Sequence, residues 1–410
     1  MKMKRSYLLI STLVVLSIVL GLGIHYRYRQ QDSLILKPIA FKQLPGWTTD
    51  DSNIQQSLSA FQISCKAFLN ASPEKSVGSG YLSLTAEDWQ PICRAALKIS
   101  VTDSIEAKAF FQQWFTPLSF QRQGSSLKGL FTGYYVPVLK GSLIKTPTYN
   151  VPIYGLPADL ISVNLEHFIP SLKGKKLVGR LSANRMVPYY SRQQINQGAL
   201  EEKAPVIAWI ESPIDRVFLE IQGSGIIQLA DGQELNVGYA GENGLPYTSI
   251  AKVLIERGIL TKDKASMQAI KHYLASNPTE IDAVLNENKS FVFFNLQNQK
   301  AALGTQGVPL TAGYSLAVDR RWIPIGAPLW LNTTVPDNHK DDGQSLKRLM
   351  IAQDTGGAIR GVIRGDVFWG SGEIATHMAG HMKNPGNYWL LLPKPVVARL
   401  TQQHLVFQDR

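Results

Sequence analysis

Short apolar runs broken by glycine and proline dominate the chain from residue 129 onward. Up to residue 237, the segments GLFTGYYVPVL, VIAWI and RVFLEIQGSGIIQL are rich in β-branched and aromatic residues, which favour strands. Similar segments follow from Ser290 onward, namely SFVFF, YSLAVD, APLWL, RLMIAQD and GVIRGDVFWG. These runs predict two β-rich parts. Because strands and helices do not alternate regularly, the pattern disfavours a parallel, doubly wound sheet.

Two other stretches show the apolar spacing of helices. The first runs from about residue 54 to residue 120 and includes IEAKAFFQQWF. The second contains three helices, each with a polar residue at its start. YTSIAKVLIERG offers Thr248 or Ser249 as its N-cap, TKDKASMQAIKHYLASNP begins at Thr261, and TEIDAVLNEN begins at Thr279. We expect these three helices to pack beside a β-barrel or sandwich.

An uncharged, mostly apolar run spans residues 7–24 and is preceded by Lys2, Lys4 and Arg5. This pattern predicts an export signal. The run approaches the length of about 20 residues that spans a bilayer, and no small-x-small cleavage site follows it. An uncleaved signal-anchor over residues 1–30 is therefore favoured, with a cleaved signal peptide as the alternative. No cysteine stands just after the run, which argues against lipidation.

Length and charge narrow the class of protein. The 410 residues predict two domains behind the anchor, and the composition is that of a folded globular body. The formal net charge is +11, of which five positive charges belong to the N-terminal region, leaving +6 for the body. A mildly basic body suits an acidic polymer or a membrane surface. Nucleic acid is a poor candidate partner because no recognised binding motif accompanies the charge.

Cys65 and Cys93 are the two cysteines of the chain. An exported protein meets an oxidising compartment, so a disulfide between them is expected. The alternative is a pair of buried thiols. Neither cysteine has a neighbouring histidine or metal-ligand spacing, so neither is predicted to be catalytic.

Candidate chemistry is concentrated between residues 353 and 372, in QDTGGAIRGVIRGDVFWGSG. Asp354 and Asp366 stand at the ends of two β-runs joined by glycine-containing turns, and a hairpin would bring both carboxyls to one rim. The apolar run before Asp354, and Phe368 and Trp369 beside Asp366, would raise the pKa of each carboxyl. A carboxyl that stays protonated near neutral pH can protonate a glycosidic oxygen. The alternative is that both aspartates cap turns.

Two further groups of residues are candidate sites. Asp319 ends a strand before Arg320 and Arg321, so a turn residue paired with arginine is its simplest interpretation. His377 and His381 are four residues apart in THMAGHM, but the glutamate of H-E-x-x-H is missing. The sequence therefore predicts no metal site and no cofactor.

Together these segments resemble a known family. YSLAVDRRWIPIGAPLWL, MIAQDTGGAIRG and RGDVFWGSG resemble the 3D (three-aspartate) domain of murein-cleaving enzymes, with Asp319, Asp354 and Asp366 in the three places. Upstream, GLFTGYYVPVLKGS, PIYGLP, FLEIQGSGIIQL and VGYAGENGLPYTSIAKVLIERG resemble the membrane-bound lytic murein transglycosylase A family. The resemblance covers residues 37 to 392, nearly the whole exported body.

The resemblance implies a mainly β fold. A double-psi β-barrel domain would comprise residues 31–136 and 292–400, whose C-terminal part is the 3D domain. A smaller β-barrel-containing domain with helices, residues 137–291, would be inserted, and substrate would lie in the groove between the two domains. Familiar family members are outer-membrane lipoproteins, whereas this N-terminus lacks a lipidation cysteine. The expected location is the periplasm, with the inner membrane holding the N-terminal helix and the outer membrane as alternative.

The implied activity is that of a peptidoglycan lytic exotransglycosylase, although the residues leave open whether strands are cut at ends or within. In the family, the aspartate at the position of Asp366 is catalytic, the Asp354 position lies beside it, and Thr132 lines the groove. Asp366 would protonate the bond between N-acetylmuramate and N-acetylglucosamine, then deprotonate the muramyl O6 hydroxyl, which attacks C1 to form a 1,6-anhydro end. High effective molarity favours this internal attack, so neither a metal nor an activated water is needed.

Other residues are candidates for substrate binding. Tyr134, Tyr135 and Trp369 could stack on sugar faces, with core packing as the alternative. Gln222 and Ser224 in QGSG could bind acetamido groups, with a tight turn as the alternative. Asp319 completes the set.

Two competing functions stay open. Asp354 could act as the base of an inverting hydrolase opposite Asp366, with carboxyls about 6.5–9.5 Å apart. Alternatively the chain could be a wall-binding scaffold that does not cut glycan. The expected partners are peptidoglycan strands, the membrane through the anchor, and cell-wall synthesis or division complexes.

Overall fold

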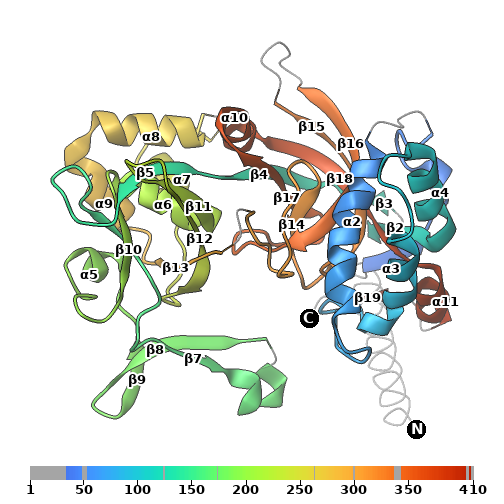
Figure 1. Cartoon of the computed structure of the whole chain (residues 1–410), viewed down its shortest axis with the longest axis horizontal. Coiled ribbons are helices and arrows are strands. Elements are labelled where there is room, and N and C mark those ends of the chain that lie inside the picture. Colours follow the sequence, from blue (N-terminus) through green and yellow to red (C-terminus); the bar gives the residue numbers. More distant parts are fainter. Residues whose placement is uncertain are drawn as a thin grey trace, which may run out of the picture. The chain divides into compact units, whose positions relative to one another are not determined.

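A computed structural model describes residues 34–48, 53–122, 125–172, 174–262, 264–298, 301–336, 343–402 and 406–407. The predicted signal-anchor lies outside these residues. Among the described residues, no helix is both long enough and apolar enough to cross a membrane. The chain forms two compact units (Figure 1). Unit 1 comprises Met1–Phe131, Tyr314–Asp366 and Asn384–Arg410, and unit 2 comprises Thr132–Gly313 and Val367–Lys383.

Unit 1 supplies most of a closed barrel, and two of the barrel strands, β4 and β17, begin in unit 1 and end in unit 2. Six strands follow the order β15-β16-β14-β17-β4-β18, and pairing of β15 with β18 closes the ring. β14 runs parallel to β16, whereas β15 is antiparallel to β16 and to β18. The predicted fold class, mainly β with a barrel, is thereby confirmed. The strands are β4 (Gly129–Val136), β14 (Ser315–Val318), β15 (Pro328–Val335), β16 (Gln344–Asp354), β17 (Arg364–Ser371) and β18 (Lys383–Pro393).

The sheet of unit 1 extends beyond the barrel and carries helices. β2 (Phe115–Arg122) pairs with β18 on one side and with β1 (Leu34–Pro38) on the other. β3 (Ser125–Ser126) and β19 (Val406–Phe407) are short additions. The helical elements are η1 (Phe41–Gln43), α2 (Ile54–Leu69), η2 (Ala86–Asp88), α3 (Gln90–Ala96), α4 (Ser104–Trp114) and α11 (Lys394–Gln402).

One end of the predicted helical stretch is wrong. The helix of IEAKAFFQQWF ends at Trp114, and the residues from Phe115 to Phe120 belong to strand β2. Pro117 lies within these residues and is incompatible with a helix interior. Phe115, Leu118 and Phe120 are buried in the strand, and both of its edges are paired.

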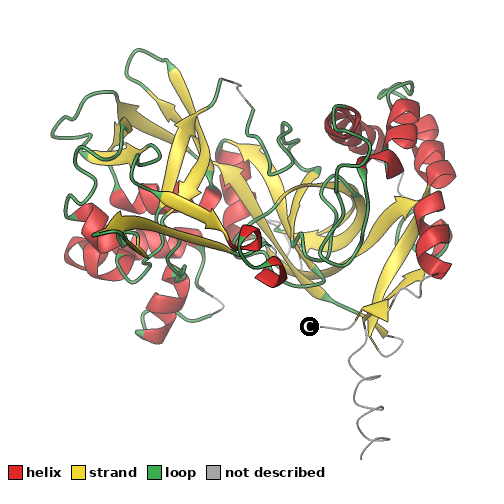
Figure 2. Cartoon of the chain, turned by 90° about the horizontal axis from the view of Figure 1, so that it is seen from below, coloured by secondary structure: helices red, strands yellow, loops and turns green. Residues whose placement is uncertain are grey.

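Unit 2 contains a second six-stranded sheet in the order β13-β12-β11-β5-β10-β6. A single parallel bridge between Gly155 and Phe294 brings the two edges of this sheet together. Its core includes Ile153, Ile227 and Phe294. The strands are β5 (Val138–Ser142), β6 (Val151–Tyr154), β10 (Val206–Ile210), β11 (Ser224–Gln228), β12 (Glu234–Glu242) and β13 (Val292–Leu296). Helices accompany strands in both units (Figure 2).

Helices of unit 2 share a second apolar core, formed by residues such as Val217, Leu254 and Leu274. The three predicted helices are present, but two begin elsewhere. Ser249 caps the first as expected, whereas Ser266 caps the second in place of Thr261, and Thr279 lies within a 3-10 turn. The elements are α5 (Arg192–Asn196), α6 (Pro213–Gln222), α7 (Ile250–Glu256), α8 (Met267–Ser276), η5 (Pro278–Glu280), α9 (Ile281–Leu285) and α10 (Glu373–His381).

The segment RVFLEIQ forms helix α6, so its prediction as a strand is wrong. The Ser212 hydroxyl accepts the Asp215 N–H at 3.2 Å, Pro213 occupies the first turn, and Gly223 ends the helix at φ +77°. These are standard start and stop signals. Leu219 packs into the core of the six-stranded sheet while Phe218 packs into the helical core. Burial on both sides explains why the segment looks like a strand in the sequence.

A separate three-stranded sheet also belongs to unit 2. Its order is β7-β8-β9, and both pairings are antiparallel. Figure 1 shows these strands beside, rather than within, the six-stranded sheet. The elements are β7 (Ile161–Asn164), η3 (Leu165–His167), η4 (Pro170–Leu172), β8 (Lys176–Ser182) and β9 (Arg185–Pro188).

Candidate active site

Asp366 is the third residue of β17 and is half-buried. Side chains two apart on a strand share a face, so Arg364 lies on the same face as Asp366. Burial lowers the pKa of Arg364, and the negative charge of Asp366 opposes this effect. Arg364 Nη1 also donates to the Leu130 carbonyl at 3.2 Å and to the Gly365 carbonyl. The candidate acid therefore lies within the field of a fixed cation.

Asp354 is the last residue of β16, where it is half-buried. Its Oδ1 accepts the Thr355 N–H at 2.8 Å. The predicted hairpin between Asp354 and Asp366 is wrong, because β14 lies between β16 and β17 in the sheet. β14 pairs in parallel with β16, placing Ser315 opposite Ile351. Residues 355–363 therefore form a crossing connection, which we call the aspartate loop.

Asp319 follows β14 and is fully buried. Its Oδ2 accepts the Gly361 N–H at 2.9 Å and an Arg321 Nη2 donor at 2.6 Å. Burial opposes the charge on this carboxyl, but the hydrogen bonds from Arg321 and Gly361 outweigh it and hold the pKa below its usual range. Since Gly361 is in the aspartate loop, this arrangement favours a role in holding the loop over direct contact with substrate.

The aspartate loop is held at a second point by Tyr388. Its hydroxyl donates to the Val362 carbonyl, one residue beyond Gly361. Tyr388 is fully buried, and burial raises the pKa of its hydroxyl. The hydroxyl is thus kept as a neutral donor. Two buried groups, Asp319 and Tyr388, fix the connection between Asp354 and Asp366.

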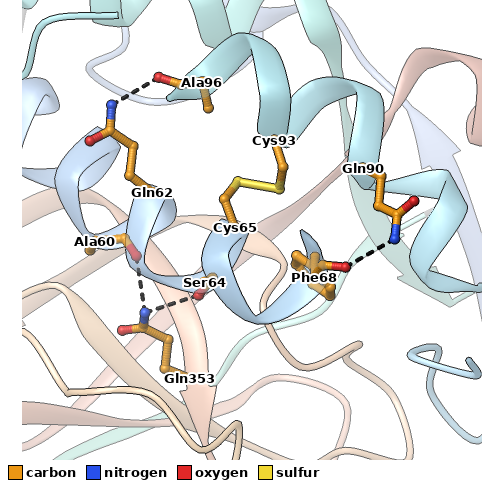
Figure 3. Close-up of a disulfide and its surroundings, with 9 residues drawn as sticks. All are labelled: Ala60, Gln62, Ser64, Cys65, Phe68, Gln90, Cys93, Ala96 and Gln353. Atoms are coloured by element: carbon orange, nitrogen blue, oxygen red, sulfur yellow. Dashed lines mark hydrogen bonds between the residues drawn. A yellow bond between two sulfur atoms is a disulfide. The ribbon is translucent and has the colours of Figure 1, made fainter. Parts of the chain in front are cut away.

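Gln353, beside Asp354, ties the end of β16 to helix α2 (Figure 3). Its Nε2 donates to the Ala60 carbonyl at 3.0 Å and to Ser64 Oγ at 2.9 Å, and its Oε1 accepts from Ser315 Oγ. The next residue of α2, Cys65, forms a disulfide with Cys93 of α3. The bridge expected from the sequence is present and joins the two helices.

Sequence reasoning missed Arg364, Gln353 and Tyr388. A signal existed for Gln353, because it is a polar residue directly after the buried apolar run from Leu349 to Ala352. A buried amide must find partners, so such a residue indicates a local anchor. Tyr388 lies far along the sequence from the aspartate loop, and no local pattern indicates that contact.

In unit 2, Thr132, Tyr134 and Tyr135 lie on β4, and both tyrosines are buried whereas Thr132 is half-buried. Tyr134 packs against Phe368 with ring centroids 5.2 Å apart. The Tyr135 hydroxyl contacts Met267 Sδ at 3.6 Å, and burial raises the pKa of Tyr135 to about 12. These contacts favour core packing over sugar stacking for the two tyrosines.

Trp369, Gln222 and Ser224 are half-buried in unit 2. A Cβ placed at Gly133 would lie 2.6 Å from Trp369 Nε1, so the glycine allows the indole to approach the strand closely. Among the described residues, Trp369 Nε1 has no hydrogen-bond partner. Gln222 ends α6, and its Oε1 accepts the Tyr135 N–H at 3.0 Å. Gln222 thus ties α6 to β4, and Ser224 begins β11 after Gly223.

The rings of His377 and His381 on helix α10 are tilted against each other, with centroids 4.4 Å apart. The Nδ1 of His381 is 2.9 Å from the His377 carbonyl oxygen. Within the described residues, no three or more histidine, cysteine, aspartate or glutamate side chains are grouped to hold a metal ion.

Two family models match the chain in sequence order. The MltA specific insert domain matches residues 130–295, and the 3D domain matches residues 314–392. The membrane-bound lytic murein transglycosylase A of Escherichia coli strain K12 is 37% identical over 282 residues, covering 68% of this chain and 70% of that relative. The chain belongs to the membrane-bound lytic murein transglycosylase A family. The resemblance predicted from the sequence is confirmed.

Solved structures agree with this family. The crystal structure of the membrane-bound lytic murein transglycosylase from Agrobacterium tumefaciens has a TM-score of 0.78 and 30% identity, covering 89% of this chain and 99% of that one. The structure of Escherichia coli MltA with bound chitohexaose has a TM-score of 0.65 and 28% identity, covering 88% of this chain and 94% of that one. A relative of this lytic transglycosylase A family member has thus been crystallised with a glycan.

Proposed function

We propose that this protein is a lytic transglycosylase of peptidoglycan. It cleaves the β-1,4 bond between N-acetylmuramic acid and N-acetylglucosamine and leaves a 1,6-anhydromuramic acid end. Membership of the lytic murein transglycosylase A family carries the proposal. The glycan bound by the Escherichia coli relative, chitohexaose, has β-1,4-linked sugars, as the backbone of peptidoglycan does.

In the proposed mechanism Asp366 is the single acid and base. Its protonated carboxyl gives a proton to the glycosidic oxygen while the bond to C1 of the muramyl sugar breaks. The resulting carboxylate removes the proton from the O6 hydroxyl of the same sugar. O6 then bonds to C1, so the products are the anhydro end and a free 4-hydroxyl on the departing sugar. Asp366 ends the cycle protonated.

In the proposed mechanism, Arg364 and Asp354 act on the pKa of Asp366 in opposite directions. The cation of Arg364 stabilises the carboxylate form. A negative charge on Asp354 would stabilise the protonated form, which is the role that we propose for Asp354. The balance of the two decides the pH range in which Asp366 can donate.

Substrate contacts are proposed for residues of unit 2. Trp369 has a half-buried indole, and Thr132, Gln222 and Ser224 are half-buried polar residues. We assign Tyr134 and Tyr135 to shaping β4, because both are buried. Asp319 acts through the aspartate loop by its bond to Gly361.

We further propose that the enzyme is periplasmic and is held at the inner membrane by residues 1–30. Cell-wall synthesis or division complexes would recruit it. Separation of inner and outer membranes, followed by detection of the chain and its intact N-terminus, tests this localisation. Recovery of the chain in the outer-membrane fraction would contradict this localisation. Cleavage of the chain within residues 1–30 would also contradict it.

The catalytic assignment is tested by digesting purified sacculi with the parent and with Asp366→Asn, and identifying the products by mass spectrometry. We expect anhydro ends from the parent and a rate about 10²–10⁴-fold lower for the variant, the usual contribution of a positioned acid and base. Asp354→Asn is the matched control and should keep more activity. Reducing ends from the parent would support the inverting hydrolase. Binding without any cleavage by the parent would support the scaffold.

A further inference from the structure

The three-stranded sheet of β7, β8 and β9 has its apolar face exposed. Residues directly opposite each other in antiparallel strands share a face. Val163 is opposite Leu177, and Leu181 is opposite Met186. Ile161 is opposite Gly179, which shares the face of Leu177 and Leu181 by strand alternation. We call the surface formed by these five apolar side chains the apolar face; they are Ile161, Val163, Leu177, Leu181 and Met186.

The opposite face of this sheet packs on the rest of unit 2. A Cβ at Gly244 would lie 2.5 Å from the Cβ of Val178. The guanidinium of Arg180 lies 4.3 Å from the ring centroid of Tyr190. The more polar side of the sheet is therefore the covered one, which reverses the usual arrangement of an antiparallel sheet.

Exposure of the apolar face is substantial. Leu177 is 52% exposed and Leu181 is 64% exposed. The connection between β7 and β8 adds Phe168, 73% exposed, and Ile169. Contiguous exposed apolar side chains mark an interaction surface, because a soluble protein otherwise avoids them.

Basic residues lie in the strands of this sheet and next to them. Lys175 and Lys176 are exposed at the start of β8, and Arg185 is exposed at the start of β9. Lys176 is opposite Asn164 and Arg185 is opposite Ser182, so both side chains leave the ends of the sheet on the face opposite the apolar face. Residues 161–188 contain five basic residues and one acidic residue, Glu166, which gives +4. The whole body carries +6, so most of its net charge belongs to this sheet. A second copy of the chain would bring an equally basic sheet, so charge disfavours self-association.

We propose that the β7-β8-β9 sheet docks on an anionic lipid membrane. The apolar face enters the boundary between headgroups and acyl chains, while the net charge of +4 on residues 161–188 attracts the sheet to the anionic headgroups. Apolar burial and electrostatic attraction add in such peripheral binding. The sheet is thus a second membrane contact, separate from residues 1–30 and from the residues assigned to catalysis.

The test uses the full chain reconstituted in phosphatidylglycerol or phosphatidylcholine vesicles. Cys65 and Cys93 are joined in a disulfide, so a cysteine introduced by Leu181→Cys can be labelled alone with a fluorophore. Lipids brominated on their acyl chains then quench a label that enters the bilayer. Ser182→Cys is the matched control, because neighbouring side chains on a strand alternate and residue 182 points to the face opposite residue 181.

We expect the label at residue 181 to be quenched and shifted to shorter wavelength in phosphatidylglycerol. The label at residue 182 should retain its fluorescence, and both should do so in phosphatidylcholine. Lys176→Gln and Arg185→Gln should each lower the ratio of docked to undocked protein about fivefold. Unchanged cleavage of sacculi by these variants shows that they are folded.

Three results would overturn the proposal. The first is no quenching at residue 181 in either lipid. The second is equal quenching at residues 181 and 182. The third is a fluorescence change at residue 181 that does not depend on lipid charge. If it depends on protein concentration, the face binds a second copy of the chain, and if it depends on added glycan strands, the face binds the polymer.

Discussion

Both units bury charged side chains, but they do so in different ways. In unit 1 the Asp319 carboxylate is fully buried, whereas the Arg321 side chain that binds it is 59% exposed. In unit 2 Arg192, Arg216 and Glu220 are all buried and lie together. Solvent reaches one partner of the Asp319 pair and none of the unit 2 cluster. The comparison indicates that the charge of Asp319 in unit 1 responds to pH, whereas the charges of Arg192, Arg216 and Glu220 in unit 2 are fixed and structural.

The unit 2 cluster joins three elements. Arg192 of α5 donates to both carboxylate oxygens of Glu220 in α6, at 2.9 and 2.6 Å, and its Nε donates to the Asn288 carbonyl at 2.8 Å. Glu220 Oε2 also accepts the Val292 N–H at the start of β13, at 3.2 Å. Burial lowers the pKa of Arg216 to about 10, and the charge of Glu220 opposes this. Glu220 is thus the anionic partner of two buried cations.

The largest effect on stability is predicted for Glu220→Gln. Removing one member of a buried ion pair leaves uncompensated charge and costs about 3–5 kcal/mol. The control is Glu287→Gln, whose partner Arg257 lies at 3.3 Å on the surface and whose loss should cost about 0–1 kcal/mol. Hydrogen exchange measured peptide by peptide in urea locates the change. Equal effects of the two substitutions would remove the distinction between buried and exposed pairs.

The disulfide gives the next largest effect, and it concerns unit 1 alone. Cys65 and Cys93 are 28 residues apart, and closing a loop of this length stabilises a fold by about 3 kcal/mol. The double substitution Cys65→Ser and Cys93→Ser should therefore speed hydrogen exchange in α2 and α3. Peptides around Glu220 should exchange as in the parent. Faster exchange spread equally over both units would contradict this.

The strands of unit 1 were predictable because their local pattern is strong. RLMIAQD lies within β16 as predicted, and β15 and β17 contain most of APLWL and of GVIRGDVFWG, whose first three residues belong to the aspartate loop. The prediction that was wrong concerns which strands pair when they are far apart in the sequence. β14 lies between β16 and β17 because the barrel closes in this order, and no local property of residues 354–366 indicates this order.

In unit 2 the failure was of another kind. α6 is apolar on two sides because it serves two cores, so its helical period is hidden. The candidate site shows the same limit. Pairing of Asp319 with arginine was predicted, but its bond to Gly361 was not, because a backbone donor has no side-chain signal. Whether Asp366 and Thr132 act on substrate stays a prediction.

A smaller effect is predicted for Asp319→Asn. Its carboxyl pKa is lowered in the fold, so the charge stabilises unit 1 above the unfolded pKa of about 3.9 and this stability is lost as pH falls through the folded value. Loss of charged hydrogen bonds should cost about 1–3 kcal/mol at pH 7. The difference between parent and variant should shrink as the solution is acidified below pH 4.

Unfolding in urea at several pH values measures this difference. Glu106→Gln is the control, because Glu106 is exposed on α4 of the same unit. It should change stability by less than about 0.5 kcal/mol. A difference for Asp319→Asn that stays constant or grows with acid would show that the carboxylate charge is not what holds the aspartate loop.

The smallest effect is a shift of the pH profile by Arg364→Gln, and it tests the proposed acid directly. Asp366 must carry a proton to cleave, so the rate falls as pH rises through its pKa. Arg364 favours the carboxylate, so removing the cation should raise the pKa of Asp366 and move this fall to higher pH. Arg364→Lys keeps the charge and should keep the parent profile, although either substitution can alter the bond to Leu130. A shift to lower pH with glutamine, or the same shift with glutamine and lysine, would mean that the field of Arg364 does not govern the proton on Asp366.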